Sequence, residues 1–155
     1  MNEAETSQAK FAGIVAANQY MVLSTADDAG VPWASPVWFA SEDGRDLYWV
    51  SDPGARHSAN LAVRPQLAIA IFDSTQRPGT GEGAYLSATG GLVPSEEIDA
   101  GIAIYSGASQ RAKLTAWTRE DVEPPARLRL YRANAQERFV LGPGDRRVAV
   151  DGHSS

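Results

Sequence analysis

The sequence predicts a mainly β fold, an antiparallel barrel with helices at its start, in its middle and in its late third. About seven short segments combine apolar residues with the β-branched and aromatic types that strands favour. These segments follow one another through tight turns, such as Asp27–Gly30 and Glu42–Arg45, and not through the long crossovers that parallel strands need. The pattern therefore favours a barrel over a doubly wound parallel sheet.

Helices are expected where apolar residues recur with a helical period. Phe11, Ile14 and Val15 stand at i, i+3 and i+4, which predicts an amphipathic helix. Pro65 stops a second helix, and Ser95 with acids behind it begins a third. The expected helical ranges are 7–19, 56–63, a segment from 95 onward and 109–118.

The expected strands and the domain organisation complete the fold prediction. The strand ranges are 20–25, 32–41, 47–51, 67–72, 84–93, 128–132 and 138–141. The strand at 67–72 is apolar on both faces and is expected to be central. Residues 1–155 are expected to form one domain, with an N-terminal helix within 1–19 and a loose tail over 143–155.

Composition excludes several classes of protein. The formal net charge is -5 with both signs mixed along the chain, so no basic surface for nucleic acid is expected. The longest apolar run, Leu67–Phe72, is too short to cross a bilayer, and the N-terminal segment lacks the pattern of a secretory signal. We expect a cytoplasmic protein with no membrane partner. The absence of cysteine excludes disulfides, thiolate metal sites and a cysteine nucleophile.

Two motifs look functional but favour simpler interpretations. Gly79–Gly83 is glycine-rich, yet a strand follows it where a dinucleotide-binding loop needs a helix, so a flexible hairpin loop is favoured. The only histidines are His57 and His153, with no metal-binding spacing and no nucleophile elbow around a serine. Metalloenzyme and hydrolase functions are therefore weakly supported, and no metal site is expected.

The strongest local signal is the segment from Ser51 to Leu61. A strand ends at Ser51, a tight turn follows, and a helix opens at Arg56 and His57. Helix N-termini present free N–H groups and a positive dipole end to anions, and an arginine can bind a phosphate through two donors. On these grounds alone a solvated Arg-His pair is the favoured interpretation, and a phosphate site is the alternative.

The strand that contains Trp33–Phe39 is unusually aromatic and carries Pro36 in its middle. Proline removes a hydrogen-bond donor and belongs at a sheet edge or an irregular position. A flat, apolar group could lie against such a strand, but for Trp33 and Phe39 individually ordinary core and dimer contacts are favoured.

At these residues the chain resembles the pyridoxamine 5'-phosphate oxidase-like family, the FMN-binding split barrels. The order and spacing of several short pieces carry the resemblance. The pieces are Val22–Thr25, Gly30–Phe39, Leu47–Ser51, Arg56–His57 before Asn60–Leu61, and Phe72–Asp73 before the glycine loop.

The resemblance implies a cofactor, a site and an assembly. It implies FMN, with its phosphate on Arg56 and His57 and with Val50 and Ser51 near the ribityl chain and phosphate. The strand that carries the isoalloxazine ring corresponds to Ser35, Pro36, Val37 and Trp38. Glu82 lies near a position where the family often has a ring-contacting glutamine. The family also implies a homodimer with the cofactor at the subunit interface.

Two departures from the family's pattern change the expectations. The second basic residue is usually lysine, and here it is His57, whose neutral form carries no charge. A bound phosphate is expected to raise the pKa of His57, so that cofactor affinity falls as the pH rises through that pKa. The segment Arg138–Leu141 does not reproduce the family's basic substrate motif, so synthesis of pyridoxal phosphate is not expected.

The function expected from the resemblance is an FMN-dependent oxidoreductase that passes a hydride to or from a small molecule. One alternative is a reductase that uses a deazaflavin coenzyme, whose acidic tail could meet Arg111, Lys113 and Arg119. Another is a non-enzymatic flavin-binding protein. A heme-handling protein is the last alternative, and His57 is then the only plausible axial ligand.

Overall fold

The helices and strands follow one another along the chain largely in the predicted order. The computed structural model describes residues 2–151. The strands are β1 (Tyr20–Ala26), β2 (Pro32–Trp38), β3 (Asp46–Ser51), β4 (Gln66–Ile71), β5 (Ala84–Leu92), β6 (Arg129–Leu141) and β7 (Arg147–Ala149). The α-helices are α1 (Glu3–Ala17), α2 (Arg56–Val63) and α3 (Ile98–Arg111). Single 3-10 turns lie at Ser95–Glu97, Arg119–Val122 and Pro143–Asp145.

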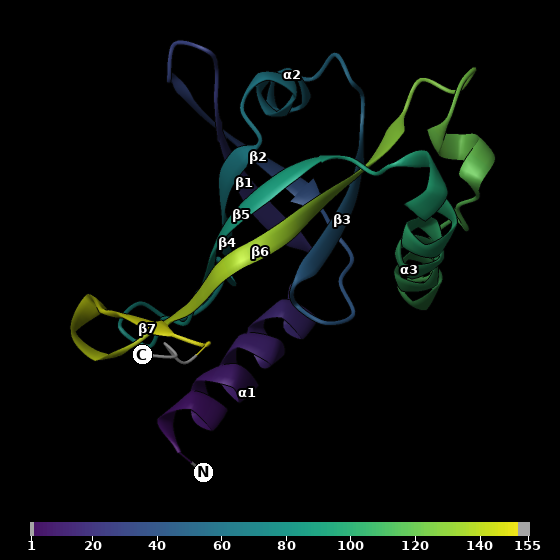
Figure 1. The fold of residues 1–155 in the computed structure, drawn as a ribbon. Coiled ribbons are helices and arrows are strands. Elements are labelled where there is room, and N and C mark those ends of the chain that lie inside the picture. Colours follow the sequence, from purple (N-terminus) through teal and green to yellow (C-terminus); the bar gives the residue numbers. More distant parts are fainter. Residues whose placement is uncertain (1, 152–155) are drawn as a thin grey trace.

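The strands form one curled antiparallel sheet. Its order is β2-β1-β4-β5-β6-β3, and β7 pairs with β6 beside this path. Just beyond β2, the amide of Ala40 donates to the carbonyl of Tyr48 at 3.0 Å, and the amide of Tyr48 donates back at 2.8 Å. This single bridge joins the two ends of the sheet. The result confirms the predicted mainly β split barrel, and Figure 1 shows α1 and α2 at its opposite ends.

A tight turn fixes the β1–β2 hairpin of the barrel. The Asp27 side chain accepts hydrogen bonds from the amides of Ala29 and Val31 at 3.0 and 2.9 Å. Gly30 adopts φ 82°, a left-handed conformation that glycine accepts without steric cost. Because both devices are local, the sequence predicted this hairpin correctly.

Two apolar clusters hold the elements together. The larger cluster fills the barrel, where Trp49 and Tyr131 stack at 5.6 Å and Phe11 of α1 closes one end. The smaller cluster lies outside the barrel, between α3 and the outer face of β3. A Cβ on Gly101 would lie only 2.8 Å from the ring of Tyr48, so the close approach of α3 requires glycine there.

The expected helix at 109–118 does not form as a separate element. Helix α3 continues to Arg111, and Lys113 then takes a left-handed conformation with φ 61°. The hydroxyl of Ser109 donates to the carbonyl of Thr115 at 2.6 Å, which binds the returning chain back against the helix. Serine side chains compete with helical hydrogen bonding in this way. The spacing of apolar residues, on which the predicted helix rested, gives no sign of this competition.

The C-terminal part of the chain also differs from expectation. The segments 128–132 and 138–141 are one 13-residue strand, β6, whose polar middle hid its continuity. The segment after Pro143, expected to be loose, forms a 3-10 turn and strand β7, where Ala149 pairs with Phe139. Residues 152–155 of that tail lie outside the described residues. No helix within residues 2–151 is long and apolar enough to span a bilayer.

Candidate functional site

The predicted phosphate site lies where β3 ends and α2 begins. Asp52 holds the turn between them, because its carboxylate accepts from the amide of Gly54 at 2.8 Å and its carbonyl accepts from the amide of Ala55 at 3.0 Å. This turn brings the first residues of α2 back onto the end of β3. Ser51 Oγ and His57 Nε2 consequently lie 2.9 Å apart.

The first turn of α2 offers hydrogen-bonding capacity that the protein itself does not use. The residue before the helix is Ala55, and no side chain caps the helix there. Ser58 in the same turn is only 4% exposed, and its Oγ has no hydrogen-bond partner among the described residues. An eight-residue helix whose N-terminus lacks a cap and faces a Ser-His pair is a suitable anion site.

Arg56 connects this helix end to the edge strand β2. Its guanidinium lies 4.2 Å from the ring centre of Trp33, which is 41% exposed on β2. Such cation–π contacts hold an arginine in place while its donors stay available. The residues expected at the phosphate and the strand expected to carry the ring therefore lie side by side.

Strand β2 is an edge strand, as Pro36 in its middle requires. Pro36 is exposed and Ser35 is half-buried, and as successive residues of a strand they point to opposite faces. Val37 belongs to the barrel core, and Trp38 packs edge-on against Tyr105 of α3 at 5.2 Å. The side chains of Val37 and Trp38 are therefore engaged in packing, and only their backbone remains for a ligand.

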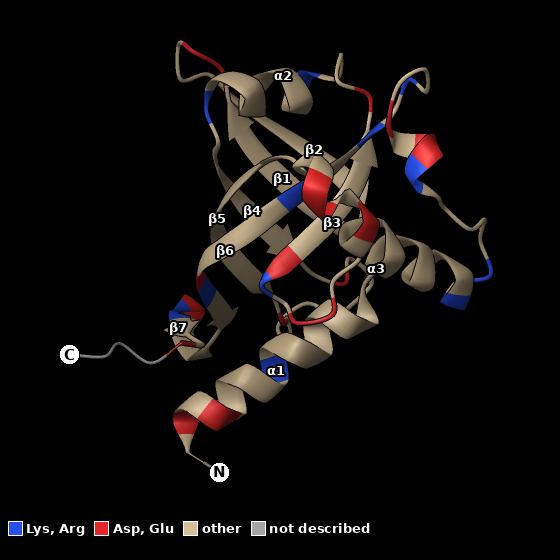
Figure 2. Cartoon of the chain, turned by 45° about the vertical axis from the view of Figure 1, so that its right-hand side comes forward, with Lys and Arg blue, Asp and Glu red and all other residues tan. Residues whose placement is uncertain are grey.

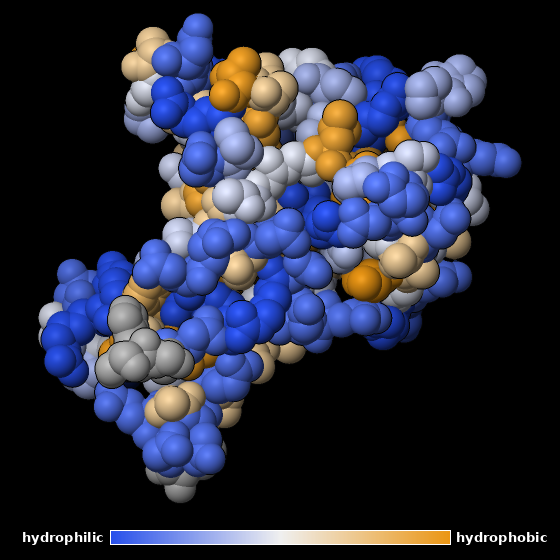
Figure 3. All heavy atoms as spheres, in the orientation of Figure 1, coloured by the Kyte–Doolittle hydropathy of each residue, from blue (hydrophilic) through white to orange (hydrophobic). Residues whose placement is uncertain are grey.

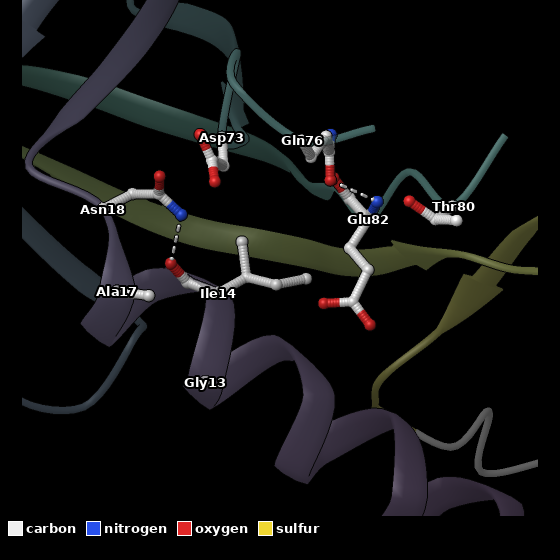
Figure 4. Close-up of a pocket in the computed structure, with 8 residues that line it drawn as sticks. All are labelled: Gly13, Ile14, Ala17, Asn18, Asp73, Gln76, Thr80 and Glu82. Atoms are coloured by element: carbon white, nitrogen blue, oxygen red, sulfur yellow. Dashed lines mark hydrogen bonds between the residues drawn. The ribbon is translucent and has the colours of Figure 1, made fainter. Parts of the chain in front are cut away.

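Val50 and Glu82 lie apart from the Arg56–His57 pair. Val50 is half-buried on the outer face of β3, against the α3 cluster. Glu82 lines a cavity of about 330 Å³ between α1 and the glycine loop, together with Asn18 and Asp73 (Figure 4). Strand β4, six residues or about 20 Å long, separates that loop from α2. Within a single chain, Glu82 therefore lies away from the phosphate site.

Burial changes the protonation of His57. The ring is half-buried, and this desolvation lowers the pKa of His57 below its ordinary value of 6.5. The imidazole is consequently neutral near pH 7 in the absence of an anion. Figure 2 shows basic and acidic residues mixed over the elements. The positive charge at the N-terminus of α2 therefore comes from a few residues there and not from a large basic surface.

The sequence did not reveal one residue that the fold brings to this site. Arg129, the first residue of β6, pairs with Ser51 across the β3–β6 ladder. The two positions are far apart in the chain, and no local motif connects them. Only the observation that 128–132 is a strand could have suggested Arg129, and only if its pairing with β3 were known.

Comparison with protein families gives a match over most of the chain. The sequence profile of the family described as pyridoxamine 5'-phosphate oxidase matches residues 7–141. Comparison with curated proteins gives no match.

Three solved structures illustrate the similarity of fold. A heme binding protein from Mycobacterium smegmatis has a TM-score of 0.70 at 23% identity, over 92% of this chain and 57% of that one. HutZ, the heme storage protein from Vibrio cholerae, has a TM-score of 0.69 at 21% identity, over 85% and 92%. General stress protein 26 from Bacillus anthracis has a TM-score of 0.63 at 16% identity, over 91% and 98%. The chain thus spans little more than half of the first of these proteins, and at these identities the likeness concerns the fold.

Proposed function

Because the chain belongs to the pyridoxamine 5'-phosphate oxidase family, we propose that it binds FMN at the β3–α2 junction. We propose further that it acts in the cytoplasm as an oxidoreductase on a small molecule. FMN, when bound, supplies a ring that accepts or donates a hydride, and the protein supplies binding and orientation. The short distance between Ser51 Oγ and His57 Nε2, beside Arg56 at an uncapped helix end, carries this proposal.

Each residue at the junction has a distinct role toward the phosphate. Arg56, already oriented by Trp33, provides a planar fork that two phosphate oxygens can accept from. His57 provides a ring N–H and Ser51 a hydroxyl, and the amides of the first turn of α2 add the positive end of the helix dipole. The edge of β2 at Ser35 and Pro36 provides the backbone against which the ring can lie.

We propose that the working assembly is a homodimer with the cofactor between its subunits. The distance between Glu82 and α2 supports it, because a second copy of the chain could bring its own Glu82 to the ring. Exposed apolar side chains also support it, among them Val31 beside β2 and Val63 at the end of α2. Figure 3 shows hydrophobic atoms at the surface of the end of the molecule where α2 lies. Surfaces of this kind mark protein–protein contacts.

The direct test is to purify the protein, denature it and identify any released chromophore by absorbance and mass. FMN is expected, or tight binding of added FMN if none is retained. Release of a deazaflavin would instead indicate a reductase that uses a deazaflavin coenzyme. A colourless protein that binds neither compound would contradict the proposed function.

Heme is a second candidate ligand, because a neutral, half-buried His57 is in the form that binds a metal. Two of the similar structures are also described as heme proteins. Hemin titration distinguishes the two cases. A heme protein would show a Soret band that disappears in His57→Ala, whereas an FMN protein would bind hemin only weakly.

FMN affinity is expected to fall as the pH rises above neutrality. Burial lowers the pKa of His57 in the free protein, and a bound dianionic phosphate raises it. Binding therefore takes up a proton, and the added affinity is lost as the pH rises through the pKa of the complex. Each pKa unit of this rise corresponds to about a tenfold change in Kd. Titrations between pH 7 and 9, where the phosphate stays dianionic, measure the slope.

The matched variants for this prediction are His57→Asn and His57→Lys. Asparagine cannot titrate, so its Kd is expected to be weak and independent of pH. Lysine restores a charge that persists across this range, so its Kd is expected to be tighter and flat. The neighbouring arginines keep their charge throughout and cannot create the slope. An equal slope in wild type and His57→Asn would show that His57 does not bind the phosphate.

A further inference from the structure

Arg129 lies at the same end of the barrel as the phosphate site. It stands directly opposite Ser51 in the antiparallel β3–β6 pair, so the two side chains share a face about 5 Å apart at Cβ. The next pair on that face is Trp49 with Tyr131, which stack inside the barrel. Arg129 and Ser51 therefore form the outermost inward-facing pair, at the opening beside α2.

The charge of Arg129 has no counter-ion among residues 2–151. Its Nη1 donates to the carbonyls of Ala126 and Leu128, the latter at 2.7 Å, but no carboxylate lies within ion-pair distance. The half-buried Arg132 and the buried Arg138 both pair with carboxylates. The other arginines without a carboxylate partner are exposed, so Arg129 is the one partly buried guanidinium of the described chain without an opposite charge.

A partly buried cation without a counter-charge is unfavourable unless something compensates it. The two backbone carbonyls occupy one of its nitrogens and leave donors on the others. The hydroxyl that faces it, Ser51, is bonded to His57 at the helix N-terminus, where Arg56 also lies. An anion at this helix end would be neighboured by all three basic side chains.

We propose that Arg129 is a third cationic ligand of this site, and that the site selects a terminal phosphate monoester over a diester. The inference deepens the proposed function and rests on it. Arg56 and Arg129 carry two permanent charges, and a monoester carries about -1.5 to -2 at pH 7. A diester carries a single charge and leaves one guanidinium uncompensated. The charge balance therefore favours FMN over a coenzyme whose phosphate lies within a chain.

The test measures FMN and riboflavin affinities in parallel for Arg129→Gln, Arg129→Lys and Arg127→Gln. Arg129→Gln is expected to weaken FMN binding about 10- to 100-fold and to leave riboflavin binding unchanged. Arg129→Lys should recover part of the loss. Arg127 is the control, because its exposed guanidinium already pairs with Asp52 at 3.4 Å. Equal losses for FMN and riboflavin, or none for FMN, would overturn the inference.

A second measurement separates failure of the inference from failure of the proposed function. The chain has only two histidines, so the imidazole NMR signals can follow His57 directly. Methyl phosphate is expected to raise the pKa of His57 in wild type more than dimethyl phosphate does, and Arg129→Gln should remove most of the difference. This result in a protein that binds no flavin would overturn FMN binding and uphold the monoester site. No response to either compound would overturn the monoester site.

Discussion

The Arg56→Ala variant is expected to bind FMN more weakly by about 1.5–3 kcal/mol, roughly 10- to 150-fold in Kd. Arg56 opens α2 and is held against Trp33 at 4.2 Å, so its donors are oriented before a ligand arrives. Alanine removes a charge-assisted pair and that orientation together. Quenching of flavin fluorescence on titration measures the effect directly.

Three comparisons make the Arg56 result specific. Riboflavin, which lacks the phosphate, should bind wild type and Arg56→Ala alike. Arg64→Ala is the control on the same helix, because Arg64 lies at its C-terminal end and donates to the carbonyls of Asp27 and Asp28. The fold should survive, since loss of an exposed cation–π contact costs only about 0.5–1 kcal/mol. Unchanged FMN affinity in Arg56→Ala would remove the phosphate site from this helix.

Features determined by nearby residues could be predicted from the sequence. The β1–β2 hairpin depends on Asp27 and Gly30, and the helix from 56 to 63 depends on the turn at Asp52 and the stop at Pro65. Pro36 predicted an edge or irregular position for the aromatic strand, and β2 lies at the edge. The junction of β3 and α2 therefore emerged from a stretch of only a few residues, before any long-range contact was known.

Features determined by distant pairing could not be predicted. The continuity of β6 depends on its pairing with β5 and β3, not on its own polar middle segment. The same pairing brings Arg129 to Ser51, and β4 separates Glu82 from α2. The β7 strand forms because β6 extends far enough to pair with it. Each of these contacts joins segments whose local sequence shows no sign of the partner.

Asp151, just after β7, forms an ion pair with the buried Arg138, and loss of this pair should have the largest effect on stability. Arg138 is 3% exposed and donates to both carboxylate oxygens of Asp151 at 3.0 and 2.7 Å (Nε and Nη2). Asp151→Asn leaves this cation in the barrel wall with only Gln8 and the ring of Phe11 beside it. We expect the free energy of unfolding to fall by about 2 kcal/mol, less than for a fully buried pair because Asp151 is 38% exposed.

The pH dependence should identify the same pair. The Arg138 guanidinium, with a smaller contribution from Arg45, lowers the pKa of Asp151 below its ordinary value of 3.8. The pair therefore stabilises the fold fully above that value, and its contribution disappears as the pH falls through the pKa of the folded state. Urea titrations from pH 7 to pH 3 should show a steeper acid loss in wild type than in Asp151→Asn. Parallel curves would mean that the Asp151 carboxylate is stabilised by neither guanidinium in solution.

Comparing the stabilities of Arg138→Met and Asp151→Asn distinguishes the cost of an unpaired buried charge from the cost of a lost contact. Arg138→Met removes the cation and fills its place with an apolar side chain, leaving a carboxylate that water can reach and that still pairs with Arg45. It should therefore cost less stability than Asp151→Asn, although it deletes the larger group. Asp145→Asn, which breaks an ion pair whose carboxylate is 87% exposed, should change stability by less than about 0.5 kcal/mol. If Arg138→Met were the more destabilising variant, packing around Arg138 and not its compensated charge would hold this end of the barrel.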